Sequence, residues 1–145
     1  MDLPHPKREL PSDPRHRPDD GVLRPNDART LRLFDAHGRL IGNTDWHCGN
    51  ISLVLVHGDW HLSPANDMLP MLYMPLAGEV VAQELGVEKM VPTAQTLDVW
   101  GKAQKLAMAF WEAVVHEERI PGVFRDLAWG NALARAADLK NSENQ

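Results

Sequence analysis

The sequence contains a single cysteine, Cys48, so the chain cannot form an internal disulfide bond. A lone thiol is typical of a protein in a reducing compartment. No apolar run approaches the roughly 20 residues that a membrane-spanning helix needs. The N-terminus is polar and has no apolar segment of the kind that signal peptides carry. We therefore expect a cytoplasmic protein that makes no contact with a membrane.

Clusters of basic residues are also missing from the sequence. The 15 lysines and arginines are outnumbered by 20 acidic residues, which gives a formal charge of -5. This balance is unfavourable for a surface that binds nucleic acid directly. The length of 145 residues suggests one domain, and a hydrophobic content of 43% is sufficient for a core.

The first 25 residues are rich in proline and charge and poor in apolar side chains. Proline removes backbone donors and disfavours helix at the preceding residue, and few apolar groups are present to offset the entropy of ordering. We predict a disordered or extended arm over residues 1–25, a folded domain over residues 26–140 and a frayed tail over residues 141–145. The prolines of the arm are Pro4, Pro6, Pro11, Pro14, Pro18 and Pro25.

Apolar residues recur at helical spacing in three stretches. The first helix would begin near Asn26 or Asp27, either of which can cap it, and end at Gly38 or Gly42. Its apolar face would contain Ala28, Leu31, Phe34 and Ile41. The second would span residues 96–118, with a buried face of Trp100, Ala103, Ala107, Phe110, Trp111 and Val114. The third would span residues 123–139, with Phe124, Leu127 and Ala134 on one side.

One β-hairpin is expected between the first and second helices. Residues 51–56 are almost wholly apolar and predict a strand with at least one buried face. Residues 57–59 suit a tight turn, and residues 60–63 would form the returning strand before Pro64. Because an antiparallel hairpin brings its two ends together, Asn50 and Asp67 should face one small volume. The fold class is mainly α with one β-hairpin.

The most informative stretch precedes this hairpin. Asp45 and Asn50 are separated by four residues, and Asp67 follows the hairpin. In kinase-type phosphoryl transfer, a loop aspartate orients the acceptor hydroxyl and accepts its proton. An asparagine five positions later and an aspartate after a short hairpin hold magnesium, which prefers oxygen ligands. The order and types of these residues match that arrangement.

Each of these residues also has an ordinary structural interpretation. Asp45 would be a loop cap at a helix end, Asn50 a turn amide that leads into a strand, and Asp67 a helix cap. The residues His47, Cys48, His57 and His61 fit no standard zinc spacing. A small buried or half-buried residue is a commoner role for Cys48 than that of a nucleophile.

The wider string identifies a family. Residues 41–52 and 62–71 closely resemble the C-terminal lobe of the HipA-like serine/threonine kinases, which are toxins of bacterial toxin–antitoxin pairs. The resemblance covers roughly residues 27–136 and implies a protein-kinase-like C-lobe, the HipA C-terminal domain. It implies ATP- and magnesium-dependent phosphorylation of a serine or threonine in a protein substrate. Asp45 then matches the catalytic aspartate, and His47 would lie near the transferred phosphate. Asn50 and Asp67 match the ligands of the magnesium that accompanies ATP.

The sequence departs from this family in two respects. Asn66 stands where the family usually has an aromatic residue before the second aspartate. No Gly-rich loop precedes Asp45, and no strand before it carries a lysine for the ATP phosphates. We therefore expect the chain to be inactive unless a partner supplies an N-terminal lobe; an antitoxin is another expected partner. The alternative is a non-catalytic remnant or a protein-binding module of a toxin–antitoxin system, in which the Met-rich segment 68–74 and the tryptophans carry the contacts.

Overall fold

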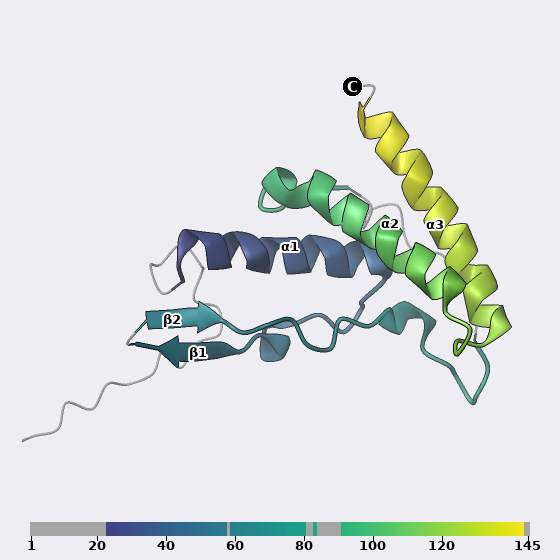
Figure 1. Ribbon diagram of the computed structural model, residues 1–145, viewed down its shortest axis with the longest axis horizontal. Coiled ribbons are helices and arrows are strands. Elements are labelled where there is room, and N and C mark those ends of the chain that lie inside the picture. Colours follow the sequence, from purple (N-terminus) through teal and green to yellow (C-terminus); the bar gives the residue numbers. More distant parts are fainter. Residues whose placement is uncertain (1–22, 58, 81–82, 84–90, 144–145) are drawn as a thin grey trace, which may run out of the picture.

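The computed structural model describes residues 23–57, 59–80, 83 and 91–143. In this part the chain forms three α-helices and one antiparallel pair of strands (Figure 1). The helices are α1 (Pro25–Ile41), α2 (Trp100–His116) and α3 (Gly122–Glu143), and the strands are β1 (Leu53–Val56) and β2 (Asp59–Leu62). Short 3-10 turns span Cys48–Asn50, Met71–Tyr73 and Leu97–Val99. The predicted class, mainly α with one hairpin, is confirmed.

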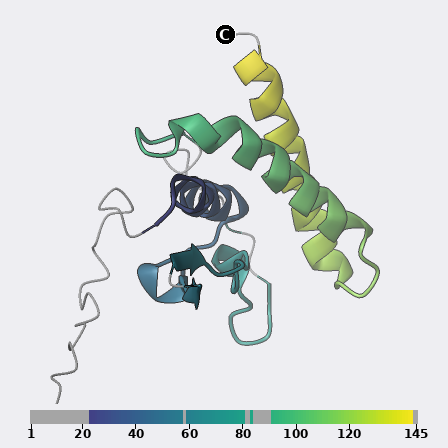
Figure 2. The same ribbon diagram turned by 60° about the vertical axis from the view of Figure 1, so that its left-hand side comes forward.

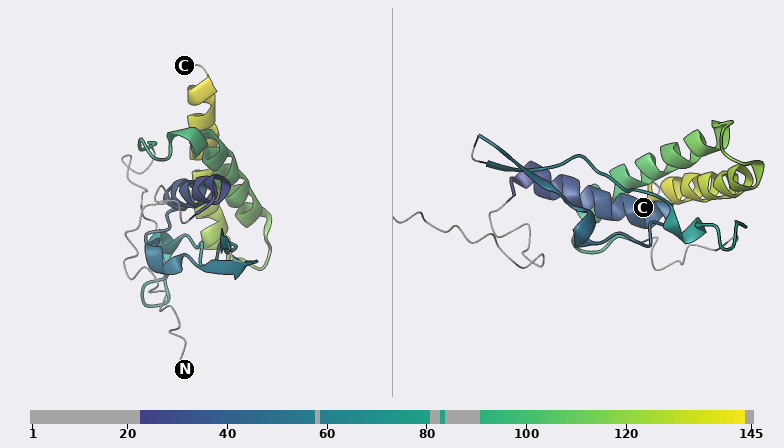
Figure 3. Two further views of the ribbon diagram at one scale, coloured as in Figure 1. Left: turned by 90° about the vertical axis from the view of Figure 1, so that its left-hand side faces the viewer. Right: turned by 90° about the horizontal axis from the view of Figure 1, so that it is seen from below.

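Helix α1 lies in the middle of the molecule. The hairpin lies along one side of it and the α2–α3 pair lies on the other, and the rotated views in Figures 2 and 3 show the same order. Helices α2 and α3 are joined by residues 117–121 and run back along each other. Within the described residues, none of the helices combines the length and apolar character needed to cross a membrane.

Helix α1 begins earlier than the sequence predicted and ends at one of the two predicted glycines. Pro25 is its first residue and Arg24 is the capping residue, without a side-chain hydrogen bond, so Asn26 and Asp27 lie inside the helix. Proline suits this position because the first helical amides have no intrahelical partner. Of the two candidate terminators, Gly42 ends the helix with φ of 79°, whereas Gly38 stays buried within it. The predicted arm up to residue 22 lies outside the described residues.

The core forms where α1 and α3 both pack on α2. The side chain of Trp111 is 1% exposed, and the predicted face of α2 is buried almost as expected. Tyr73 meets Trp111 edge-on, with ring centroids 5.6 Å apart, and its hydroxyl donates to Oδ1 of Asn131 at 3.2 Å. Burial raises the pKa of Tyr73, although the hydrogen bond to Asn131 opposes that shift. The core therefore joins the segment after the hairpin to two helices.

Helix α3 buries a different face from the predicted one. Phe124 and Leu127 are half-buried as the spacing suggested, but Ala134 is exposed. The buried positions are Ala128, Ala132 and Arg135. The helix also continues to Glu143, into the segment that the sequence assigned to a tail.

The hairpin has the predicted pairing but not the predicted burial. Leu53 pairs with Leu62, and Val56 pairs with Asp59 across the turn. All four side chains of β1 are exposed, from 36% at Leu53 to 59% at Leu55, so the expectation of a buried face is wrong. An apolar run predicts a strand whether or not the described chain supplies a surface to cover it.

Polar contacts fasten the hairpin to the start of α1. Nη2 of Arg24 lies 2.8 Å from Oδ2 of Asp59, next to the turn. Nδ1 of His61 lies 3.9 Å from Oδ2 of Asp27. Arg24 caps α1 and Asp27 lies in its first turn, whereas Asp59 and His61 belong to β2, so the tip of the hairpin lies against the N-terminal end of the helix.

Candidate functional site

The site begins where α1 ends. Gly42 adopts a left-handed conformation that residues with a Cβ enter at a cost. A Cβ at this position would lie 3.2 Å from Cβ of Leu72 and 3.3 Å from Cε2 of Tyr73. The amide of Leu72 donates to the carbonyl oxygen of Gly42 at 2.9 Å. The end of α1 is therefore attached directly to the segment that returns from the hairpin.

Asn43, the next residue, connects the two halves of the predicted site. Asn43 is buried, with only 7% of its surface exposed. Oδ1 of Asn43 accepts the amide N–H of Asp45 at 3.2 Å, and Nδ2 donates to the carbonyl oxygen of Asp67 at 3.2 Å. The buried amide of Asn43 is thus hydrogen-bonded to the backbones of both aspartates, although they are 22 positions apart.

Sequence reasoning did not assign a role to Asn43. The available signal was local: an asparagine two positions before Asp45 can accept that residue's amide in an Asx turn. The bond to Asp67 depends on how the chain returns from the hairpin, which no local pattern reports. Asn43 is accordingly the component of the site that the structure adds.

The carboxylates of Asp45 and Asp67 are both exposed. Within the described part of the chain, neither carboxylate takes part in a hydrogen bond or an ion pair. Asp67 has φ of 57°, in the left-handed region that few residues other than glycine adopt. Such conformations persist when surrounding contacts enforce them and are common at functional sites. The bond from Asn43 to the carbonyl of Asp67 is one such contact.

His47 has a defined orientation within the loop. The amide of Gly49 donates to its Nδ1 at 2.9 Å. An Nδ1 that accepts a hydrogen bond places the proton of a neutral imidazole on Nε2, which is then a donor. A Cβ at Gly49 would lie 2.7 Å from Cε1 of His47, so this folded-back ring requires glycine at position 49. His47 is exposed and can present its donor to a ligand.

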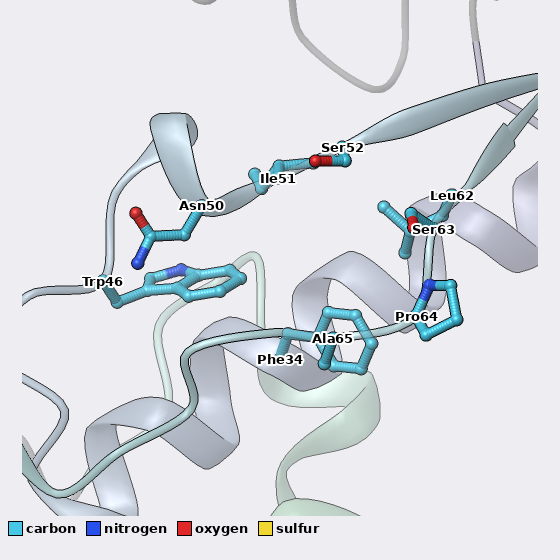
Figure 4. Close-up of a pocket in the computed structure, with 9 residues that line it drawn as sticks. All are labelled: Phe34, Trp46, Asn50, Ile51, Ser52, Leu62, Ser63, Pro64 and Ala65. Carbon is cyan, nitrogen blue, oxygen red and sulfur yellow. The ribbon is translucent and has the colours of Figure 1, made fainter.

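Asn50 lies at the edge of a pocket beneath the hairpin (Figure 4). Its Nδ2 donates to the carbonyl oxygen of Asp45 at 3.4 Å, which leaves its Oδ1 available as a ligand. Figure 4 shows the Asn50 amide beside the ring of Trp46, on one wall of a small pocket of about 10 Å³. The other lining residues are Phe34, Ile51, Ser52, Leu62, Ser63, Pro64 and Ala65.

The two ends of the hairpin meet at this pocket, but the pocket does not bring Asn50 and Asp67 together as the sequence predicted. The amide of Ser63 donates to the carbonyl oxygen of Ser52 at 2.8 Å and extends the ladder beyond the two strands. Asn50 and Ala65 line the same pocket, but Asp67 does not. Asp67 is instead joined to the loop of Asp45 through Asn43.

The oxygen atoms of this site suit a magnesium ion in type. The Oδ1 of Asn50 and the carboxylate of Asp67 are hard ligands that internal contacts leave available. Among the described residues, no group of three or more histidines, cysteines, aspartates or glutamates is arranged to hold a metal. Magnesium commonly takes only one or two carboxylates from the protein and completes its shell with phosphate and water. In chemical type, these two oxygen ligands are compatible with magnesium.

The chain is similar to a known bacterial protein. Over 93 residues the chain is 37% identical to Toxin YjjJ of Escherichia coli (strain K12). The aligned stretch is 64% of this chain and 21% of that protein, so the chain spans about a fifth of the toxin's length. No family model and no solved structure matches the chain. The chain is thus similar to part of that toxin over almost two thirds of its own length.

Proposed function

We propose that this chain is the C-terminal, catalytic-loop portion of a HipA-like serine/threonine kinase with a kinase-like C-lobe. It would transfer the γ-phosphoryl group of ATP to a protein hydroxyl. The observation that carries the proposal is the joining of the Asp45 loop to Asp67 through Asn43. The family resemblance of residues 41–71 and the similarity to a bacterial toxin support it.

Each residue then has a distinct role. Asp45 would orient the acceptor serine or threonine and take its proton as the new oxygen–phosphorus bond forms and the bond to the β-phosphate breaks. Asn50 and Asp67 would hold magnesium, which neutralises phosphate charge when it is bound. The Nε2–H of His47 would donate to an oxygen of the transferred group. All four side chains come from residues 45–67, on one side of α1.

The exposed hairpin supports the need for a partner. A two-stranded hairpin is marginally stable unless another surface covers it. The four apolar side chains of β1 are uncovered within the described residues, although strands of this composition are normally buried. We propose that a second chain, which carries the Gly-rich loop and the phosphate-binding lysine, covers β1 and completes the ATP site. Without that chain, phosphoryl transfer should be very slow, because positioning and charge neutralisation are most of the catalysis.

A second candidate function follows from the same exposure. In α3, Trp129 and Leu133 are each 55% exposed, one helical turn apart. Together with β1, they favour a binding module of a toxin–antitoxin system that keeps the fold without the chemistry. The two candidates differ in whether the aspartates bind nucleotide and metal.

Calorimetry with magnesium-ATP separates these candidates. The chain should be titrated alone and together with the product of a neighbouring reading frame that encodes a Gly-rich loop and a strand lysine. We expect heat of binding with the partner, its loss in Asp67→Ala, and its retention in the control Asp126→Ala, which removes an exposed acid on α3.

A transfer assay with labelled ATP completes this test. Asp45→Ala should retain nucleotide binding and lower phosphate transfer by at least about a hundredfold, the usual scale for a positioned proton acceptor. Absence of binding heat, alone and with the partner, would contradict the kinase proposal and leave the binding module as the better account.

A further inference from the structure

We infer that Asn43 is a positioning residue that sets Asp45 and Asp67 in register and thereby determines the affinity of the site for a divalent cation. This inference rests on the proposed function, because it assigns Asp67 to the metal. It adds a residue that does not touch the ligand. Asn43 acts through the backbone of both aspartates, with its oxygen accepting at one side and its nitrogen donating at the other.

The position of Asn43 is itself tightly defined. Its amide N–H donates to the carbonyl oxygen of Gly38 at 2.8 Å, which links it to the last turn of α1. The preceding residue, Gly42, accepts the amide of Leu72 at 2.9 Å. Both attachments are backbone hydrogen bonds. They fix the Cα of Asn43 between the end of α1 and the segment that returns from the hairpin.

The side chain has little freedom at that point. It is buried, and its Nδ2 also lies 3.9 Å from Sδ of Met68. A buried amide that loses its partners leaves unsatisfied polar atoms, so the two hydrogen bonds are retained together. Asn43 therefore fixes the backbones of both aspartates relative to the end of α1.

Only an amide side chain of this length serves both contacts. Aspartate at position 43 would keep an oxygen for the amide of Asp45, but it has no donor for the carbonyl of Asp67. Asn43→Asp is thus a selective variant: it breaks one side of the connection and also adds a negative charge near the site. If only charge mattered, this variant would bind cations more tightly.

The experiment uses Mn²⁺ as the probe and the full chain labelled with ¹⁵N. Substoichiometric Mn²⁺ broadens the amide signals of residues close to it, so a titration reports both affinity and location. In the native chain we expect broadening at residues 45–50 and at residues 66–68. Asn43→Ala and Asn43→Asp should each weaken Mn²⁺ binding by roughly ten- to a hundredfold, the usual effect of removing an outer-shell partner.

Asn131→Ala is the matched control. Asn131 is a half-buried amide that likewise makes two side-chain hydrogen bonds, from Tyr73 and to the carbonyl of Leu127, but it lies in α3 within the helical core. This variant should lose stability and yet bind Mn²⁺ like the native chain. Hydrogen exchange of the Asp45 amide supplies a second measurement: Asn43→Asp should protect it, whereas Asn43→Ala should not.

The outcomes distinguish this inference from the function on which it rests. If Asp67→Asn leaves the Mn²⁺ titration unchanged, the metal site itself is wrong. If Asp67→Asn abolishes binding while Asn43→Asp binds as well as the native chain or better, the metal site stands and the role of Asn43 is overturned. Equal losses of Mn²⁺ affinity in Asn43→Asp and Asn131→Ala would also overturn it, because general destabilisation would then explain both losses.

Discussion

The helical core and the hairpin segment of this protein handle their apolar residues in opposite ways. In the core, formed by α1, α2, α3 and Tyr73, large side chains such as Leu40 and Trp111 are about 1% exposed. In the hairpin segment, residues 44–66, the strand β1 exposes every one of its apolar side chains. On the proposed function, folding and chemistry depend on different parts of the chain, and three substitutions, two of them with a matched control, test that separation.

The largest effect should follow from Trp111→Ala. The side chain is 1% exposed and packs against Tyr73 and Phe124, so its removal should lower the free energy of unfolding by about 3–5 kcal/mol. The matched variant Trp129→Ala removes a side chain that is 55% exposed and should change stability by about 0.5 kcal/mol or less. Urea denaturation followed by circular dichroism measures both. Similar values for the two variants would contradict the placement of the core.

An intermediate effect is expected at the junction of the two regions. Gly42→Ala places a Cβ at φ of 79°, which costs about 1–2 kcal/mol, and crowds Leu72 and Tyr73. Gly130→Ala is the control, since a Cβ there meets open space in the middle of α3. That variant should be more stable than the native chain by roughly 0.5–1 kcal/mol. Thermal unfolding of both variants checks the opposite signs.

The smallest effect on stability should come from the hairpin. Leu55 is 59% exposed, so Leu55→Lys should change the free energy of unfolding by about 0.5 kcal/mol or less. If β1 is the surface that a second chain covers, the same variant should weaken that association strongly, because it buries an unpaired charge. Analytical ultracentrifugation of the mixture tests the second part. A large loss of stability in the isolated chain would show that β1 is covered after all.

Much of the fold was predictable because it is encoded locally. The spacing of Trp100, Ala103 and Ala107 identified α2 and its buried face, and the apolar run after Asn50 identified the hairpin. Prediction failed where the outcome depends on neighbours. In α3, Ala134 is exposed and Arg135 is buried, because the packing of the helix on α2 decided which face was covered.

The sequence proposed the residues of the candidate site but not how the chain connects them. The order of Asp45, Asn50 and Asp67 carries the family signal, and residue type alone indicated oxygen ligands. The role of Asn43 required a contact across 24 positions, which sequence periodicity does not report. The folded-back ring of His47 likewise depends on Gly49, because a Cβ at that position would collide with the ring. This contact is visible only in the structure.

The closure between Asn43 and Asp67 has a consequence for how this chain could change over time. The segment between these two positions leaves the helical core and returns to it, and its hairpin also contacts the start of α1. On the proposed function, substitutions between these positions should affect the reaction more than the helical core. Loss of the proposed reaction would therefore leave a folded protein that still binds its partner. Retention of the fold is for this reason weak evidence that the reaction is retained.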